Sequence, residues 1–233
     1  MWLFFLLPSC SMKSHFTPDF FDFFKELAPN NNKEWFDENR KRYKRVVKEP
    51  FENFVIDLIE MVKKHDKTVN VLPKDCIFRI NRDVRFSKNK EPYKIQMSAV
   101  VNAGGKKNIT KPGIYTEVTP EWVRVYMGVY SPDKMQLLNL RTAIAKKGAA
   151  FNKLISNTDF VKTFGEVRGE KNVRIDKSLQ EAAKKQDLIL NKNFYFFHQM
   201  DPIYALKDDF IDRIEKIYLI GKPLSDFLDK GMN

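Results

Sequence analysis

The chain has 233 residues, of which 43% are apolar and 30% charged, so it is long enough to bury one sizeable core. Its formal charge of +11 favours acidic partners, such as an anionic small molecule, nucleic acid or an anionic membrane surface. Two cysteines exclude a disulfide framework and a thiolate zinc site, and three scattered histidines do not make a metal centre. We therefore expect no metal and no cofactor. No apolar run approaches the roughly 20 residues that a transmembrane helix needs.

The N-terminus carries a short apolar run from Trp2 to Leu7, which is shorter than the core of a secretory signal and has no basic residue before it. We expect residues 1–15 to be a poorly structured or mis-assigned extension, and residues 16–233 to form a single domain. The short segment that ends at Cys10 loosely resembles a lipoprotein cleavage box. A cytoplasmic protein is the main expectation, and a lipoprotein anchored through Cys10 is the alternative.

Three helices are predicted in the N-terminal part of the chain. The first begins at Thr17-Pro18-Asp19, where a hydroxyl cap precedes proline and an acid near the positive end of the helix dipole. Asn32 can cap a second helix, and Pro50 restarts or kinks it. The apolar stripe that follows, over residues 51–62, predicts a buried helix.

From Cys76 onwards the apolar period changes from that of a helix to that of a strand. Alternation predicts strands over residues 78–86 and 95–102, followed by a hairpin of residues 113–119 and 122–130. In the second strand of the hairpin, Arg124 and Tyr126 face the side opposite to the valines.

The C-terminal part is predicted to contain a helix after Ser131-Pro132-Asp133, a surface-lying helix over residues 151–164, a buried strand over residues 193–200 and a last helix over residues 204–219. Helices at both ends of the chain therefore flank a mostly antiparallel sheet built from hairpins. This arrangement defines an α+β fold.

The strongest functional signal is the segment of residues 78–94, which contains six basic residues and two acids. Guanidinium groups match the paired oxygens of phosphate or carboxylate, so this segment predicts an anion site, with a phosphate-bearing ligand as the first hypothesis. If the predicted strand lies near the hairpin, the polar faces of the two can share one surface. The candidate ligand-binding residues are Arg79, Arg85, Lys88, Lys90, Tyr93, Lys94, Arg124 and Tyr126. The alternative is a set of cross-strand ion pairs on a solvated sheet face.

Arg82 lies on the apolar side of the same predicted strand, together with Ile80. A buried guanidinium needs a partner, because an unpaired buried charge is costly. We therefore expect Arg82 to be substantially buried and paired with a carboxylate, which Glu34, Asp37 or Glu38 of the second helix could supply.

Two further functions remain open. In one, the protein is an enzyme that processes phosphoryl groups or nucleic acid and uses Asp83 as general base or metal ligand. In the other, the basic face docks an acidic protein partner. No serine–histidine–aspartate or cysteine–histidine spacing supports a nucleophilic mechanism.

Three segments resemble a known family: FFKELAPNNNKEWFDENRKRYK over residues 23–44, FRINRDVRFSKNKEPYK over residues 78–94, and PGIYTEV over residues 112–118. They are similar to the bacterial and fungal family catalogued as domain of unknown function 2461. The family often has histidine at the position of Asn81, so this chain departs from the pattern there. The resemblance implies a cytoplasmic single-domain protein and implies no activity.

Overall fold

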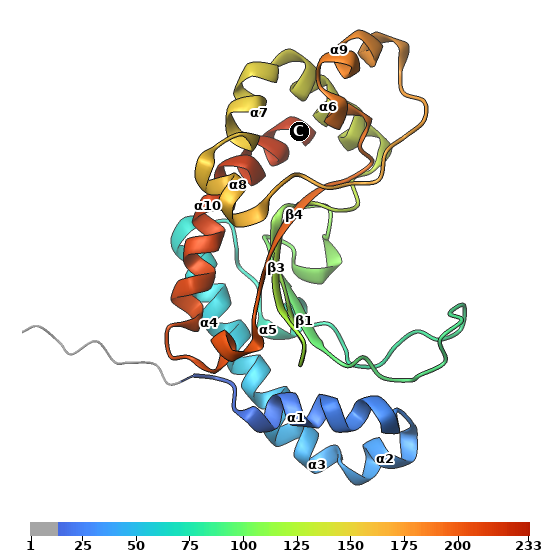
Figure 1. The fold of residues 1–233 in the computed structure, drawn as a ribbon, viewed down its shortest axis with the longest axis vertical. Helices are drawn as coiled ribbons and strands as arrows, with labels where there is room; N and C mark the ends of the chain where they lie inside the picture. The colour runs from blue at the N-terminus through green and yellow to red at the C-terminus, as the bar shows by residue number, and fades with distance from the viewer. Residues whose placement is uncertain (1–13) are drawn as a thin grey trace, which may run out of the picture.

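A four-stranded antiparallel sheet lies at the centre of the computed structural model, which describes residues 14–233 (Figure 1). The strands follow one another in space as in sequence: β1 (Met97–Val101), β2 (Gly113–Val118), β3 (Val123–Val129) and β4 (Phe194–Met200). Helices precede and follow the sheet, so the predicted α+β class is confirmed.

The helices form an N-terminal group, a group between β3 and β4, and a long C-terminal helix. They are α1 (Pro18–Leu27), α2 (Lys33–Glu38), α3 (Arg40–Tyr43), α4 (Glu49–His65), α5 (Pro73–Cys76), α6 (Lys134–Lys146), α7 (Gly148–Ile155), α8 (Thr158–Phe164), α9 (Gln180–Lys185) and α10 (Phe210–Met232). Short 3-10 or π segments join them, notably η2 (Lys44–Lys48) before α4 and η6 (Pro202–Leu206) before α10.

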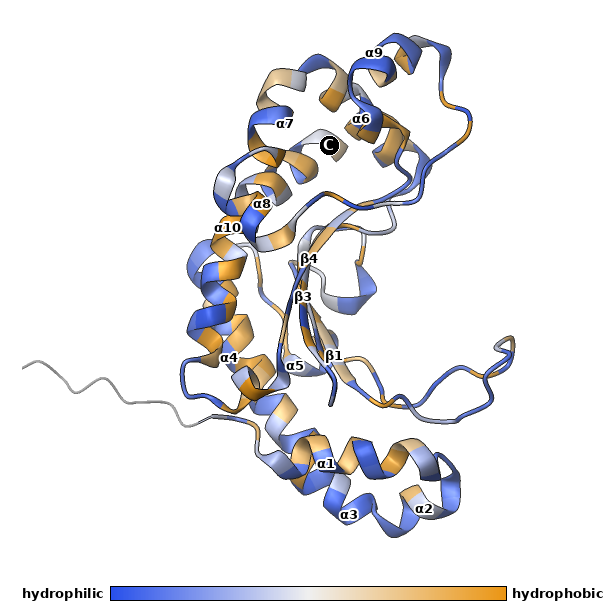
Figure 2. Cartoon of the chain, in the orientation of Figure 1, coloured by the Kyte–Doolittle hydropathy of each residue, from blue (hydrophilic) through white to orange (hydrophobic). Residues whose placement is uncertain are grey.

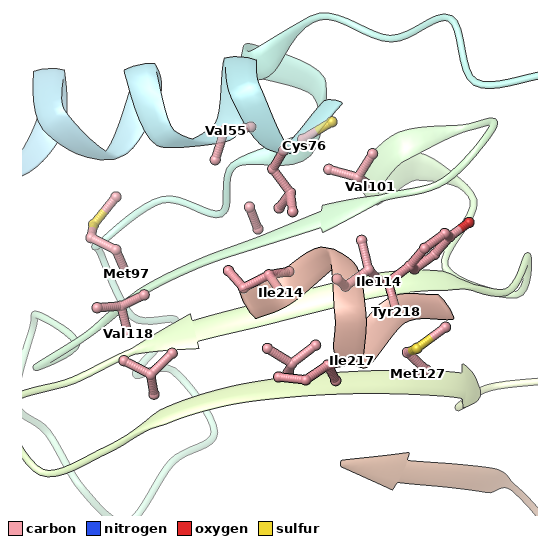
Figure 3. Packing of buried hydrophobic residues seen from close by; sticks show 14 of the residues in the cluster. Val55, Cys76, Met97, Val101, Ile114, Val118, Met127, Ile214, Ile217 and Tyr218 are labelled. Carbon is pink, nitrogen blue, oxygen red and sulfur yellow. The ribbon is translucent and has the colours of Figure 1, made fainter. Parts of the chain in front are cut away.

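One face of the sheet is covered by helices, mainly α10 and α4. Burial alternates along β3, where Val123, Val125, Met127 and Val129 are buried and the residues between them are only half-buried. Figure 3 shows the side chains of the covered face packed against Ile214, Ile217 and Tyr218 of α10. The covering helices carry apolar stripes beside polar ones (Figure 2). Burying these stripes provides most of the core energy.

The predicted hairpin is confirmed as β2 and β3, and the predicted strands near residues 95–102 and 193–200 are confirmed as β1 and β4. Gly128 in β3 has a φ of +104°, which only glycine adopts without strain, and a Cβ there would lie 2.2 Å from the Phe194 carbonyl oxygen. Glycine at this position therefore permits close pairing of β3 with β4.

The prediction of a strand over residues 78–86 is wrong. Ile77 bridges Ala99 of β1, and the Phe78 N–H donates to the Ser98 carbonyl at 3.0 Å, but the chain then leaves the sheet. Residues 78–94, which we call the arm, fold back on themselves and project away from the side covered by α4 and α10 (Figure 1). Near its tip, Phe86 is 95% exposed, so the alternating apolar residues do not form the buried face that holds a strand in a sheet.

Two helical predictions also need correction. The predicted helix over residues 151–164 is broken into α7 and α8, because Asn157 caps the second part with its side-chain oxygen, and it is not surface-lying, since Phe151 and Phe160 are buried. The last helix extends well past residue 219 to Met232 and includes Pro223. Gly221 does not end it, because this glycine lies in a tight contact with the sheet.

Ser14 and His15, which the sequence analysis placed in the extension, take part in the fold. The Ser14 hydroxyl donates to the Ala205 carbonyl at 2.8 Å, and His15 Nε2 lies 2.8 Å from an Asp57 carboxylate oxygen. The rest of the predicted extension, including the alternative anchor at Cys10, lies outside the described residues.

Tyr93 packs at the base of the arm. Its ring stacks on Phe36 with centroids 4.0 Å apart, and Asn31 bonds to both backbone groups of Tyr93. We predict that Tyr93→Ala lowers the free energy of unfolding by about 3 kcal/mol, measured by urea denaturation, because it leaves a ring-sized cavity. Tyr93→Phe, which keeps the ring, should change it little. Equal, small effects of both substitutions would contradict this packing role.

Candidate functional site

The uncovered face of the sheet, which we call the open face, carries aromatic and polar side chains in cross-strand rows. One row pairs Glu117 of β2 with Arg124 of β3, which in turn pairs with Gln199 of β4. The next row pairs Tyr115 with Tyr126, which in turn pairs with Phe197. The alternation that buries the valines on the other face therefore gathers these groups here.

The aromatic rings form a continuous chain from Phe78, which precedes β1, across β2, β3 and β4, and we call this chain the aromatic row. Neighbouring ring centroids lie 4.9 to 6.4 Å apart. The members are Phe78, Tyr115, Tyr126, Phe197, Tyr195 and Tyr130. These spacings are typical of favourable edge-to-face and tilted contacts, so each ring helps to hold its neighbours in place.

A cavity of about 510 Å³ lies on this face, and five rings of the aromatic row are among its lining. Gly113 and Gly128 are paired across β2 and β3 and belong to its lining. Glu117 and Lys111 are the charged residues among its lining. Such a mostly apolar hollow suits a flat uncharged ring better than a bare phosphate group.

Two arginines lie on the rings. The Arg124 guanidinium carbon lies 4.3 Å from the centroid of Trp122 and 5.3 Å from that of Phe197, and the Arg168 guanidinium carbon lies 4.2 Å from Phe197. Arg124 donates to Gln199 Oε1 at 2.8 Å and to the Tyr126 hydroxyl at 3.3 Å. Within residues 14–233 it has no carboxylate within 4 Å. Its charge is therefore held in place but not neutralised.

The base of the arm adds cations at the Phe78 end of the row. The Lys94 ammonium lies 5.8 Å from the centroid of Phe78. Burial lowers the pKa of Lys94, and the nearby positive charges of Arg79 and Arg82 lower it further. Arg79 is exposed and forms no ion pair in the described part of the chain. Crowded like charges of this kind are relieved when an anion binds.

The remaining predicted ligand residues of the arm lie apart from the open face. Asp83 accepts two bonds from the Arg85 guanidinium, at 3.0 and 2.7 Å, and this pairing lowers the pKa of Asp83. Lys90 donates to the Val84 carbonyl, and Lys88 is exposed. The predicted convergence of Arg79, Arg85, Lys88 and Arg124 on a single pocket is thus not observed. Arg124 and Tyr126 share the open face, and Arg79 and Lys94 lie at its edge, at the base of the arm. Arg85 and Lys88 lie farther out on the arm.

Two details of the arm differ from expectation. Arg82 pairs with a carboxylate, as predicted, but its partner is Glu91 of the arm at 3.4 Å and not an acid of the second helix, and its side chain is 30% exposed. The expectation assumed a strand whose apolar side faced the core. Tyr93 is only 5% exposed and stacks on Phe36, so its ring is not available to a ligand.

The described residues offer little for other chemistries. Residues 14–233 contain no group of three histidine, cysteine or acidic side chains placed to hold a metal ion. Cys76 is buried, which raises the pKa of its thiol to about 11, so it is a packing residue. His198 donates from Nδ1 to the Thr163 carbonyl at 2.8 Å. None of the helices in this range has a stretch long and apolar enough to cross a membrane.

Sequence reasoning missed several residues of the open face, because their neighbours come from distant parts of the chain. The missed residues are Phe78, Tyr115, Trp122, Tyr130, Arg168, Tyr195 and Phe197. The available signal was the period of two in three strands, which puts Tyr115 of β2, Tyr126 of β3, and Tyr195 and Phe197 of β4 on one side of their strands. Without the register between strands, these positions could not be joined into one surface.

Comparison with protein families gives a match to the family described as "Conserved hypothetical protein (DUF2461)" over residues 19–227. No curated protein and no solved structure matches the chain.

Tyr115 provides a test of how tightly the aromatic row is packed. Burial raises the pKa of Tyr115 to about 12, above the value near 10 of an unfolded chain. The folded state therefore holds more protons than the unfolded state between these values, and stability falls as the pH rises through this window. We predict that Tyr115→Phe makes the free energy of unfolding fall less steeply between about pH 10 and 12. Urea denaturation at several pH values measures this slope, and an unchanged slope would show that the phenol is solvated.

Proposed function

Since the chain belongs to the DUF2461 family, whose description names no activity, we propose from the site itself that the protein binds a ligand carrying both a flat ring and a phosphate group, as a nucleotide does. The observation that carries this proposal is the position of Arg124, whose guanidinium lies among rings and has no carboxylate partner within residues 14–233. An arginine held in this way can bind a phosphate while the neighbouring rings stack on the base.

The division of the site into a ring-lined cavity and a surrounding set of cations supports the same ligand. The cavity contains Glu117, which repels a phosphate, so the phosphate is expected beside it, near Arg124 and Arg168 or near the base of the arm. Both arginines lie on Phe197, which orients their planes. The ligand's ring is then expected in the cavity, against Tyr115 and Tyr126. The proposal includes a cytoplasmic location, where such ligands are abundant.

The alternative of a phosphoryl-processing enzyme has less support. Asp83 is exposed and held by Arg85, and a carboxylate whose pKa is lowered in this way is a weak general base. It is also not among the residues that line the cavity.

Calorimetric titration with a nucleoside monophosphate, the matching nucleoside and ribose 5-phosphate tests the proposal. We expect the nucleotide to bind more tightly than either fragment. Arg124→Ala should weaken nucleotide binding by about 1–3 kcal/mol, which is the scale of a charged hydrogen bond, and should leave the thermal unfolding midpoint nearly unchanged.

Arg213→Ala is a matched control, because Arg213 also lies on a ring, 4.9 Å from the centroid of Tyr204, but belongs to α10. It removes the same charge without touching the open face. If both variants weaken binding equally, or if ribose 5-phosphate binds as well as the nucleotide, the proposed site is refuted.

A further inference from the structure

Resting on the proposed function, we infer that the ligand class is single-stranded nucleic acid, laid along the aromatic row with the arm as a second contact. The juxtaposition that points to this is a row of rings that crosses β2, β3 and β4 and ends at Phe78, at the base of a basic arm.

The aromatic row offers more stacking surface than one nucleotide uses. A mononucleotide has one base, whereas Phe78, Tyr115, Tyr126 and Phe197 follow one another across the sheet with centroids 5.9, 5.6 and 4.9 Å apart. Tyr195, also in β4, and Tyr130, which follows β3, extend the row further, and Tyr130 is 64% exposed. Rings on a sheet face can stack on successive bases of one strand whatever their sequence.

The same geometry disfavours a duplex. Bases in a double helix stack on each other, so their faces cannot reach rings that lie on the surface of a sheet. Cations near the row, namely Lys94 at one end and Arg124 and Arg168 near Phe197, are placed to follow the backbone of a single strand whose bases lie on the rings.

Away from the sheet, the arm combines an exposed aromatic ring with basic side chains, as the open face does. Phe86 is 95% exposed, the Arg85 guanidinium carbon lies 5.8 Å from its ring centroid, and Lys88 is exposed nearby. A fully exposed phenylalanine on a basic segment has no role in the core. It offers one more stacking ring and further phosphate contacts to a ligand that extends past the sheet, in the direction in which the arm projects (Figure 1).

Fluorescence anisotropy with a labelled oligothymidylate of about 12 nucleotides tests the inference, with a mononucleotide as unlabelled competitor and with a duplex and polyglutamate as comparison ligands. We expect the oligonucleotide to bind at least about tenfold more tightly than the mononucleotide, and its affinity to fall steeply between about 50 and 200 mM salt.

The arm is tested with the double variant Phe86→Ala, Lys88→Ala, whose side chains are exposed and whose removal leaves the core intact. It should weaken oligonucleotide binding about tenfold and leave mononucleotide binding unchanged. The double variant Val173→Ala, Lys177→Ala is the matched control, because it removes an exposed apolar residue and a lysine from another loop. It should change neither affinity.

The outcomes separate the inference from the proposed function. If the mononucleotide binds but the oligonucleotide binds no more tightly, or the arm variant binds it as well as the wild type, the inference is overturned and the proposed function stands. Equal affinity for the duplex or for polyglutamate also overturns it, in favour of binding by charge alone. If neither nucleotide nor oligonucleotide binds, both proposals fall.

Discussion

Helix α10 lies so close to the sheet that one of its positions has room only for hydrogen. A Cβ on Gly221 would lie 2.5 Å from Met127 Sδ and 2.9 Å from a ring carbon of Phe196, which would force these core side chains to move. This contact fixes the position of the helix against Met127 of β3 and Phe196 of β4. In β2 and β3 the core is therefore built on one side, and every second side chain of these strands is left for the open face.

The character of the open face follows from this one-sided packing. In a common solvated sheet face, an arginine opposite a glutamate forms a cross-strand ion pair. Here Arg124 pairs with Glu117 in register, yet its guanidinium lies over Trp122 and bonds to Gln199, while Glu117 bonds to Gln96. The rings thus compete successfully for the cation, because a guanidinium stacks well on an aromatic face. Within residues 14–233 no carboxylate neutralises this charge, which is the feature on which the proposed function depends.

Much of the fold could be predicted from the sequence, because residues close together in the chain determine where its strands alternate and where its helices begin. The hairpin of β2 and β3 and the capped start of α1 were correct, since alternation and turn or cap residues agree there. The end of α10 was wrong, because glycine and proline near residue 221 have the local appearance of a helix end, and only the packing of that glycine on the sheet shows otherwise. Tyr93 was misassigned for the same reason: its partner Phe36 is far away in the sequence.

The candidate site was less predictable, because an alternation of apolar and polar residues does not show whether a helix covers the apolar side of the segment. Residues 78–86 and β3 show the same alternation, but the valines of β3 are buried by α10, whereas Phe86 meets only solvent. A segment whose apolar residues find no covering helix leaves the sheet, and its basic residues then lie on an arm. Arg124 and Tyr126 were placed correctly on one face, since their strand has a covered side. The open face therefore lies on the strands whose other side is buried, and the most basic segment of the chain meets it at Phe78 and Lys94.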